Sequence, residues 1–268
     1  MLAYWIRFAC IWARARFAGR AVTDVERAQW MSSGCRVLAR SLGIRVRVEL
    51  ARGATLPDGP ILIAANHLSY LDIAIFAAAA PCAFVAKREI ASWPLFGILG
   101  RLGGTIFVDR ESRLSAWKTV EAMKHRLRQG VPILFFPEGT STDGENVMHF
   151  HSPLFAAAVA CHGKVIPAAV RYTSEHEGAH AGERALCWYG DEHFLPHLMR
   201  VMRTRGFVAT VRFEKEVTAP DRKAAAWRAM DAVTRMREHL LEHDFEDLHP
   251  NCTEDGGHRQ YSASIVTA

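Results

Sequence analysis

The chain has 268 residues, of which 50% are hydrophobic and 23% are charged. This composition is typical of a globular protein with a large core, and it excludes a largely disordered chain. Lysines and arginines number 33 against 28 acidic residues, a net charge of +5. That mild excess fits a phosphate-bearing ligand or an anionic membrane, and we expect no nucleic-acid partner. The six cysteines lie singly, which argues against a disulfide framework or a structural zinc site and is typical of reduced cytoplasmic thiols.

The first 20 residues favour an amphipathic helix. At about 100° per residue, five apolar side chains fall on one arc and four arginines flank it; the five are Tyr4, Trp5, Phe8, Ile11 and Trp12. Such a helix suits the surface of an anionic bilayer, while an ordinary helix packing its aromatic residues on the domain is the alternative. The longest apolar run, residues 73–86, is interrupted by Pro81 and falls short of the roughly 20 residues that a membrane span needs.

The rest of the chain alternates between predicted strands and helices. Thr23 and Glu26 form a capping box that begins a helix over residues 23–42, which Gly43 ends. Residues 44–50 alternate between apolar and charged side chains, as a half-buried strand does. Buried strands are predicted at 61–65, 105–108, 133–136 and 165–170, a late strand at 207–213, and helices at 70–80, 113–128, 153–161 and 221–243.

This order predicts an α/β layered fold, with a mixed, largely parallel sheet flanked by helices. We divide the chain into an N-terminal amphipathic helical arm at a membrane surface (residues 1–43), one folded domain (44–249) and a disordered tail (250–268). Pro167, inside the run 165–170, predicts an edge position or a bulge for that strand.

Polar residues follow the predicted strand 61–65, where α/β folds place their sites. Ser69 can cap the next helix, and the Asp72 carboxylate can then turn back and accept a hydrogen bond from Nδ1 of His67. Nε2 of that histidine stays free to take a proton from a hydroxyl. Because Ser69 is occupied as a cap, the pair favours direct attack by a substrate hydroxyl over a covalent intermediate. A plain capping box beside a structural histidine is the alternative.

Two further stretches end predicted strands with polar residues, and a third lies inside a predicted buried strand. Asp109-Arg110 follows residues 105–108, and Arg110 could hold a phosphate through two N–H donors. Pro137-Glu138-Gly139-Thr140 follows residues 133–136 and offers an acceptor, a flexible backbone and a hydroxyl. The third stretch is Val-Ile-Pro at 165–167.

Together these stretches resemble the glycerolipid acyltransferase family, typified by bacterial 1-acylglycerol-3-phosphate acyltransferase. The matching motifs are Asn-His-x4-Asp at 66–72, Gly-x-Ile-Phe-x-Asp-Arg at 104–110, Phe-Pro-Glu-Gly-Thr at 136–140 and Val-Ile-Pro at 165–167, in the family's order. The resemblance implies an acyltransferase domain over 44–249. It also implies that His67 is the general base and that Asp72 holds it.

The resemblance implies a substrate-binding set as well. Arg110 with the Glu138-Gly139 turn is expected to bind the phosphate or head group of the acceptor. Lys87 is a candidate for the same pocket or for the developing oxyanion, and Asn66 and Thr140 complete the set. No metal or cofactor is expected. The acyl donor is a thioester of acyl-carrier protein or of coenzyme A, and the enzyme is expected at the cytoplasmic face of the membrane.

The acceptor is expected to be lysophosphatidic acid, which acylation converts to phosphatidic acid. One departure from the family favours an alternative. The family motif continues with an arginine after Thr140, where this chain has Ser141-Thr142-Asp143-Gly144. That continuation is similar to the branch that acylates lyso-ornithine lipid, which carries no phosphate.

Two other classes of function stay open. One is a metal-dependent hydrolase that uses His67 and Asp72 with the later histidines His149, His151 and His162. The other is a non-catalytic lipid-binding module, although binding alone needs no base with an orienting carboxylate.

Overall fold

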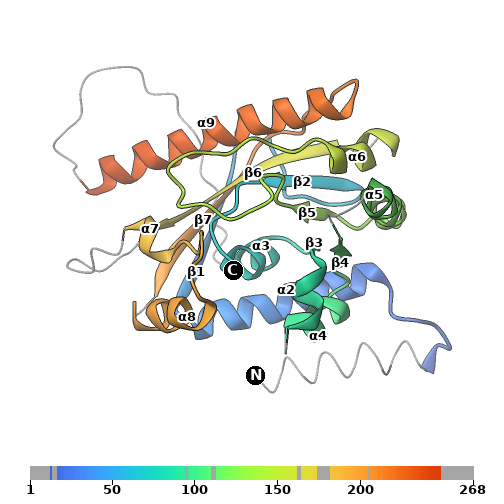
Figure 1. Cartoon of the computed structure of the whole chain (residues 1–268), viewed down its shortest axis with the longest axis horizontal. Helices are drawn as coiled ribbons and strands as arrows, with labels where there is room; N and C mark the ends of the chain where they lie inside the picture. Colours follow the sequence, from blue (N-terminus) through green and yellow to red (C-terminus); the bar gives the residue numbers. More distant parts are fainter. Residues whose placement is uncertain are drawn as a thin grey trace.

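The structure is a computed structural model that describes residue 13 and residues 17–93, 96–109, 113–161, 164–173, 182–204 and 206–248. In that part of the chain seven strands form one sheet, in the order β1-β7-β6-β2-β5-β3-β4 (Figure 1). The strands are β1 (Ile44–Leu50), β2 (Ile61–Ala65), β3 (Ala83–Lys87), β4 (Ile106–Val108), β5 (Ile133–Phe135), β6 (Lys164–Thr173) and β7 (Phe207–Phe213). Neighbouring strands run parallel except β6 and β7, which are antiparallel. The predicted mixed, largely parallel sheet is confirmed.

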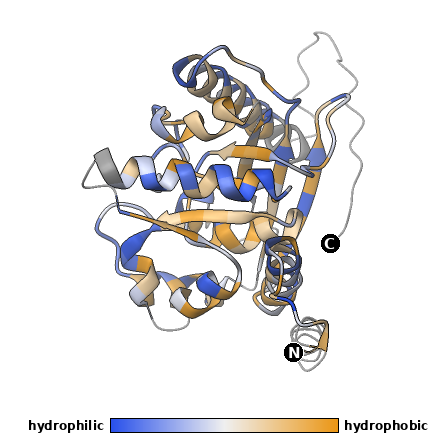
Figure 2. Cartoon of the chain, turned by 90° about the vertical axis from the view of Figure 1, so that its right-hand side faces the viewer, coloured by the Kyte–Doolittle hydropathy of each residue, from blue (hydrophilic) through white to orange (hydrophobic). Residues whose placement is uncertain are grey.

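Helices cover both faces of the sheet (Figure 1). One face carries α2 (Asp24–Ser41), α3 (Leu71–Ala79) and α8 (Phe194–Arg203), and the other carries α5 (Arg113–Arg128), α6 (Ala156–Ala160) and α9 (Arg222–Leu248). The shorter elements are η1 (Arg88–Ser92), α4 (Phe96–Leu102), η2 (Pro153–Phe155) and α7 (Glu183–Leu186). Figure 2 shows hydrophobic residues along the strands and hydrophilic residues on the helices outside them.

The burial of strand β2 on both faces explains why its sequence is apolar throughout and does not alternate with polar residues. All five of its residues are buried. Ile63 belongs to the core beneath α3, whereas Leu62 and Ala64 belong to the core shared with α5 and α9. A strand covered on both faces has no side chain that needs to be polar.

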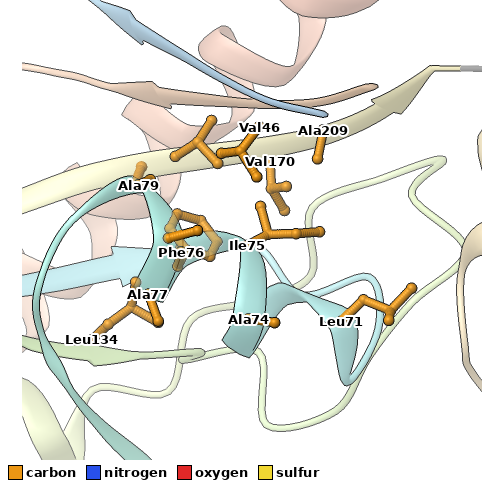
Figure 3. Close-up of a cluster of buried hydrophobic side chains, with 14 of the residues drawn as sticks. Val46, Leu71, Ala74, Ile75, Phe76, Ala77, Ala79, Leu134, Val170 and Ala209 are labelled. Carbon is orange, nitrogen blue, oxygen red and sulfur yellow. The ribbon is translucent and has the colours of Figure 1, made fainter. Parts of the chain in front are cut away.

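The apolar run at residues 73–86 is divided between α3 and β3. Helix α3 packs between the sheet and α2, so nearly all of its residues are buried. Figure 3 shows Ile75 and Phe76 of α3 among side chains of the strands, including Val46 and Val170. The alanines let the two helices and the sheet approach closely, and this close packing accounts for an apolar run that does not need a bilayer.

The capping box predicted for the first described helix is present in α2. The Thr23 hydroxyl accepts from the Glu26 N–H at 3.2 Å, and the Glu26 carboxylate accepts from the Thr23 N–H at 2.8 Å. Gly43 follows the helix with φ of 71°, as the C-terminal prediction requires. The buried Trp30 and Cys35 lie on α2, which packs against α3. The division at residue 43 stays a prediction, because the five apolar residues of the predicted arc lie outside the described residues, as does the tail from 250.

Five of the described elements were not predicted: β3, η1, α4, α7 and α8. The expected edge position of Pro167 was wrong, since β6 lies between β2 and β7 in the sheet. The alternative, a bulge, fits a one-residue change of register at the proline, because the pair beyond Ala168–Phe213 is Val165–Val217. The ladder between β6 and β7 ends at the pair Ala168–Phe213, one residue from the proline. Beyond that pair, the carbonyl of Pro167 accepts from the N–H of Glu214 at 3.0 Å. A proline without an N–H is tolerated there because the regular ladder is interrupted at this position, before pairing resumes where the N–H of Val217 donates to the carbonyl of Val165 at 2.7 Å.

Candidate active site

Three of the four predicted motifs lie where strands end at one edge of the sheet, whereas Val-Ile-Pro at 165–167 lies within β6, in register with residues 62–64 of β2. β2, β3, β4 and β5 are parallel to one another, so the residues that follow them gather at their shared carboxyl edge. Asn66-His67 follows β2, Pro137-Glu138 follows β5, and Lys87 at the end of β3 lies in register with Val108 of β4. Arg110, two residues after β4, lies outside the described residues.

His67 and Asp72 form the predicted pair. Nδ1 of His67 lies 2.7 Å from Oδ2 of Asp72. The carboxylate is completely buried, while the imidazole side chain keeps 19% of its surface exposed. A carboxylate that accepts the Nδ1 proton holds the imidazole in the tautomer whose Nε2 is unprotonated. Among the described residues Nε2 has no hydrogen-bond partner, so it is available as a base for a bound substrate.

The Asp72 carboxylate is itself held by three further donors. Oδ2 also accepts from the backbone N–H groups of Leu68 at 2.7 Å and Ser69 at 3.1 Å. Oδ1 accepts a hydrogen bond from the hydroxyl of Tyr172, a buried residue of β6. Burial and the nearby Asp72 raise the pKa of Tyr172 well above its ordinary value, so the phenol stays a donor. The role of Tyr172 was missed because it lies 100 residues from its partner.

Ser69 is not placed as a nucleophile. It is fully buried, and its Oγ accepts from the N–H of Leu71 at 3.3 Å. The expected capping box is only half formed: the carboxylate of Asp72 accepts from the Ser69 N–H, but the Ser69 hydroxyl accepts from Leu71 and not from Asp72. The residue directly before α3 is Tyr70, whose side chain makes no capping bond. The arrangement fits proton removal from a substrate hydroxyl better than a covalent intermediate on the protein.

The imidazole of His67 lies flat against Phe136, with ring centroids 3.9 Å apart and an interplanar angle of 9°. Phe136 follows β5 directly, so the neighbouring strand supplies this support. Stacking on one ring face and the bond to Asp72 together fix the direction in which Nε2 points.

Glu138 lies beneath the His67 turn. Its carboxylate is buried and accepts from the backbone N–H of His67 at 2.9 Å and of Met148 at 3.2 Å. Burial, as the largest cause, raises the pKa of Glu138 to about 7. The side chain thus joins the turn after β2 to the loop after β5, a contact over 71 residues of sequence.

Two more side chains hold the same turn. Thr142 donates to the His67 carbonyl from its N–H at 2.9 Å and from its hydroxyl at 3.2 Å. The amide of buried Asn66 pairs with the backbone of Val170, donating at 3.2 Å and accepting at 2.8 Å. Thr142 was noted in the sequence only as part of a departure from the family motif. The departure from the family motif therefore includes a residue that contacts the backbone of His67.

The remaining predicted binding residues are more exposed. Lys87 and Thr140 are exposed, and Gly139 adopts φ of 81°, a conformation that favours glycine. The tight turn lets Glu138 point inward while Thr140 faces solvent. The three residues lie at or after the ends of β3 and β5, at the same edge as His67.

A buried ion pair stands behind the site. Arg237 of α9 donates to both carboxylate oxygens of Glu183, at 2.8 and 2.7 Å, and to the carbonyls of Val170 and Gly144. Glu183 in turn accepts from the N–H of Tyr172 at 2.9 Å. α7 and α9 therefore fix the segment of β6 that carries Tyr172.

The histidines of the alternative metal site do not form a cluster with His67. The rings of His149 and His151 lie 6.0 Å apart, and His162 lies outside the described residues. No group of three or more histidine, cysteine or acidic side chains suited to a metal ion occurs in the segments that the structure describes. Within these same segments, no helix combines the length and hydropathy needed to cross a bilayer.

An oriented imidazole at the carboxyl edge of a mainly parallel sheet is the arrangement by which a histidine takes a proton from a substrate hydroxyl. The fold has a counterpart in the crystal structure of the 1-acyl-sn-glycerophosphate (LPA) acyltransferase PlsC from Thermotoga maritima. The TM-score is 0.59 at 18% identity, over 89% of this chain and 94% of that one. At this identity the likeness concerns the fold alone.

Sequence comparison defines the family. A profile described as Acyltransferase matches residues 45–171. The lyso-ornithine lipid O-acyltransferase of Rhizobium meliloti is 33% identical over 79% of this chain and 72% of that protein. The 1-acyl-sn-glycerol-3-phosphate acyltransferase of Neisseria meningitidis is 36% identical over 52% of this chain and 55% of that protein. The chain belongs to the acyltransferase family and is an enzyme that transfers acyl groups.

Proposed function

We propose that this enzyme moves a fatty acyl group from an acyl thioester to the free hydroxyl of lyso-ornithine lipid. The observation that carries acyl transfer to a hydroxyl is the contact between Nδ1 of His67 and the buried carboxylate of Asp72, beside a serine that is completely buried. The acceptor is supported by the extent of the sequence matches. Relatives named lyso-ornithine lipid O-acyltransferase align over 63% to 79% of this chain.

In the proposed reaction the acceptor hydroxyl gives its proton to Nε2 of His67 as its oxygen attacks the thioester carbonyl. The carbonyl becomes a tetrahedral oxyanion, and the bond to sulfur then breaks. His67 returns its proton to the leaving thiolate, so the products are the ester and the free thiol. Asp72 stays ionised and stabilises the transient imidazolium.

The site residues divide into two proposed groups. His67 and Asp72 carry the proton transfer. Lys87, Arg110 and the Gly139-Thr140 turn are candidates for binding the head group or the oxyanion, since they follow strands at the catalytic edge. Asn66 and Glu138, which the family resemblance also placed in the binding set, bond backbone groups in the structure. We assign these two a positioning role.

The donor is a thioester of acyl-carrier protein or coenzyme A, and no metal is part of the proposed mechanism. A lipid acceptor requires that the enzyme work at a bilayer, which we place at the cytoplasmic membrane face. An exposed apolar stripe on α8, made of Leu195, Met199 and Met202, supports contact with lipid. The ring of Phe194, also on α8, packs on Phe96 of α4 and on Tyr70, three residues from His67. The stripe thus adjoins the site.

Lysophosphatidic acid is the second candidate acceptor. It is favoured by the 36% identity to the Neisseria meningitidis enzyme. That identity is higher than the 33% to the Rhizobium meliloti relative, but it extends over 140 residues against 223. The chain nevertheless lacks the family arginine after Thr140 and has Ser141 there.

The test offers the two lysolipids separately with one acyl thioester. We expect wild-type enzyme to acylate lyso-ornithine lipid and to leave lysophosphatidic acid nearly unused. Ser141→Arg restores a candidate phosphate ligand and should raise turnover of lysophosphatidic acid relative to wild type. Turnover of lysophosphatidic acid alone by wild type would overturn the proposed acceptor, and turnover of neither would overturn both.

A further inference from the structure

We propose that the hydroxyl of Tyr172 is a positioning group for the reaction: it holds the Asp72 carboxylate in the orientation that aims Nε2 of His67 at the acceptor, and it takes up part of the charge of that carboxylate. The inference rests on the proposed function, because it concerns the same histidine. Tyr172 lies just beyond the segment that the family profile covers, which ends at residue 171.

The two carboxylate oxygens of Asp72 accept hydrogen bonds from different donors. Oδ2 of Asp72 accepts from Nδ1 of His67 and from the N–H groups of Leu68 and Ser69. Among the described residues, Oδ1 accepts only from Tyr172. A carboxylate held at one oxygen can still turn about its Cβ–Cγ bond. The phenol prevents that rotation and so fixes the oxygen that faces the imidazole.

The Asp72 carboxylate is completely buried. Water therefore cannot replace the Tyr172 hydroxyl as a hydrogen-bond donor if that hydroxyl is removed. An unpaired carboxylate oxygen in such a place keeps its charge density, which strengthens its attraction for the imidazolium that forms when Nε2 takes up a proton. This stronger attraction moves the pH at which the histidine becomes an effective base upward.

Tyr172 is itself held rigidly by neighbouring elements. Its ring packs on Phe207 with centroids 5.1 Å apart, and its N–H donates to Glu183, the partner of Arg237. Because β7, α7 and α9 together hold Tyr172, its side chain cannot easily shift to follow a moving carboxylate. The phenol therefore donates its hydrogen bond from a fixed position.

Other titratable or charged groups face this pair and have to be kept constant in a test. They are Glu138 after β5, Glu183 and Cys187 at α7, and Arg237 on α9. None of them is changed by Tyr172→Phe, which removes one oxygen and keeps the ring. Tyr70→Phe is the matched control, since the hydroxyl of Tyr70 lies in the same region and bonds Nδ1 of His197 at 3.0 Å in place of Asp72.

The experiment follows the NMR titration of the His67 ring in wild type, Tyr172→Phe and Tyr70→Phe, with His67→Ala to assign the resonance, and measures kcat and KM against pH. In Tyr172→Phe we expect the His67 midpoint and the acidic limb of kcat/KM to move up by about one pH unit. kcat should fall about tenfold with KM for the acceptor nearly unchanged. Tyr70→Phe should keep the wild-type midpoint.

An unchanged His67 midpoint in Tyr172→Phe would overturn the inference, even if the variant unfolds at a lower temperature, because a purely structural role predicts that result. The NMR titration does not depend on turnover. If wild type acylates neither lysolipid, the proposed function fails, while a shifted midpoint would still support the contact between Tyr172 and Asp72.

Discussion

The carboxyl group of Glu138 lies buried between two backbone N–H donors, and its pKa is raised to about 7, mainly by burial. In the unfolded chain a glutamate has its ordinary pKa of about 4.5. Below that pH both states are protonated and the group does not alter stability. Between about 4.5 and 7 the unfolded chain releases the proton while the folded protein keeps it, so stability falls as pH rises.

Glu138→Gln removes this titration. We expect the free energy of unfolding of wild type, relative to that of Glu138→Gln, to decrease as pH rises from about 4.5 to 7. Urea unfolding at several pH values measures the difference. Two curves that stay parallel through this range would contradict the raised pKa. Activity should also drop in the variant, because the amide nitrogen would meet an N–H donor of His67 or Met148.

Sequence reasoning succeeds for residues that are close along the chain and fails for distant ones. The contact between His67 and Asp72 could be predicted, because five residues and one helix start determine it. The contacts of Glu138 and Tyr172 with that pair span 71 and 100 residues. They depend on which strands become neighbours in the sheet, and local pattern does not contain that information.

At the scale of elements, helix α8 was not predicted from the sequence because it contains a proline. Pro196 lies at its third residue, where a missing N–H costs nothing because the donors of the first turn have no helical partner. Strand β3 was missed for another reason. The apolar run at 73–86 continues from α3 into β3, and periodicity cannot separate a buried helix from a buried strand.

The apolar stripe of α8 leads to a prediction about lipid. Met199→Glu and Met202→Glu place acidic groups on exposed positions, which are 49% and 59% accessible. Binding to vesicles rich in phosphatidylglycerol should weaken about fivefold for each glutamate, since one charge near an anionic surface is worth about 1 kcal/mol. Vesicle sedimentation measures the change.

The control for this test is Trp117→Glu on α5, which changes an exposed apolar residue on the opposite face of the sheet. It should bind vesicles as wild type does. Equal loss of binding in the α5 and α8 variants would contradict a lipid contact through α8 and indicate a general effect of charge.

For the whole molecule, Arg237 joins parts of the chain that are far apart. It connects α9 with α7, β6 and the loop after β5, and its side chain is only 4% exposed. Arg237→Met leaves the Glu183 carboxylate buried without its cation. We expect the free energy of unfolding to fall by about 3–5 kcal/mol, measured by denaturant unfolding.

The double variant Arg237→Met with Glu183→Gln should recover part of this loss, since no unpaired buried charge remains. A double-mutant cycle gives the interaction between the two side chains. A loss below about 1 kcal/mol in Arg237→Met alone would mean that the pair is not the link between α9 and the site that the structure indicates.

The layered sheet could be predicted from the alternation of elements, because each strand and helix has a local signature. Its strand order could not. The position of β7, which is parallel to β1 on one side and antiparallel to β6 on the other, results from packing among elements, and so does the placement of Arg237 behind the site.

The most direct test of the account is the rate of acyl transfer from a thioester to lyso-ornithine lipid in His67→Ala. The account predicts that kcat falls about 10²–10⁴-fold, the usual contribution of a general base, while the folded protein keeps its thermal stability. His149→Ala, which changes a histidine outside the pair, should react at the wild-type rate. Acyl transfer at the wild-type rate in His67→Ala would contradict the central claim that His67 takes the proton from the acceptor.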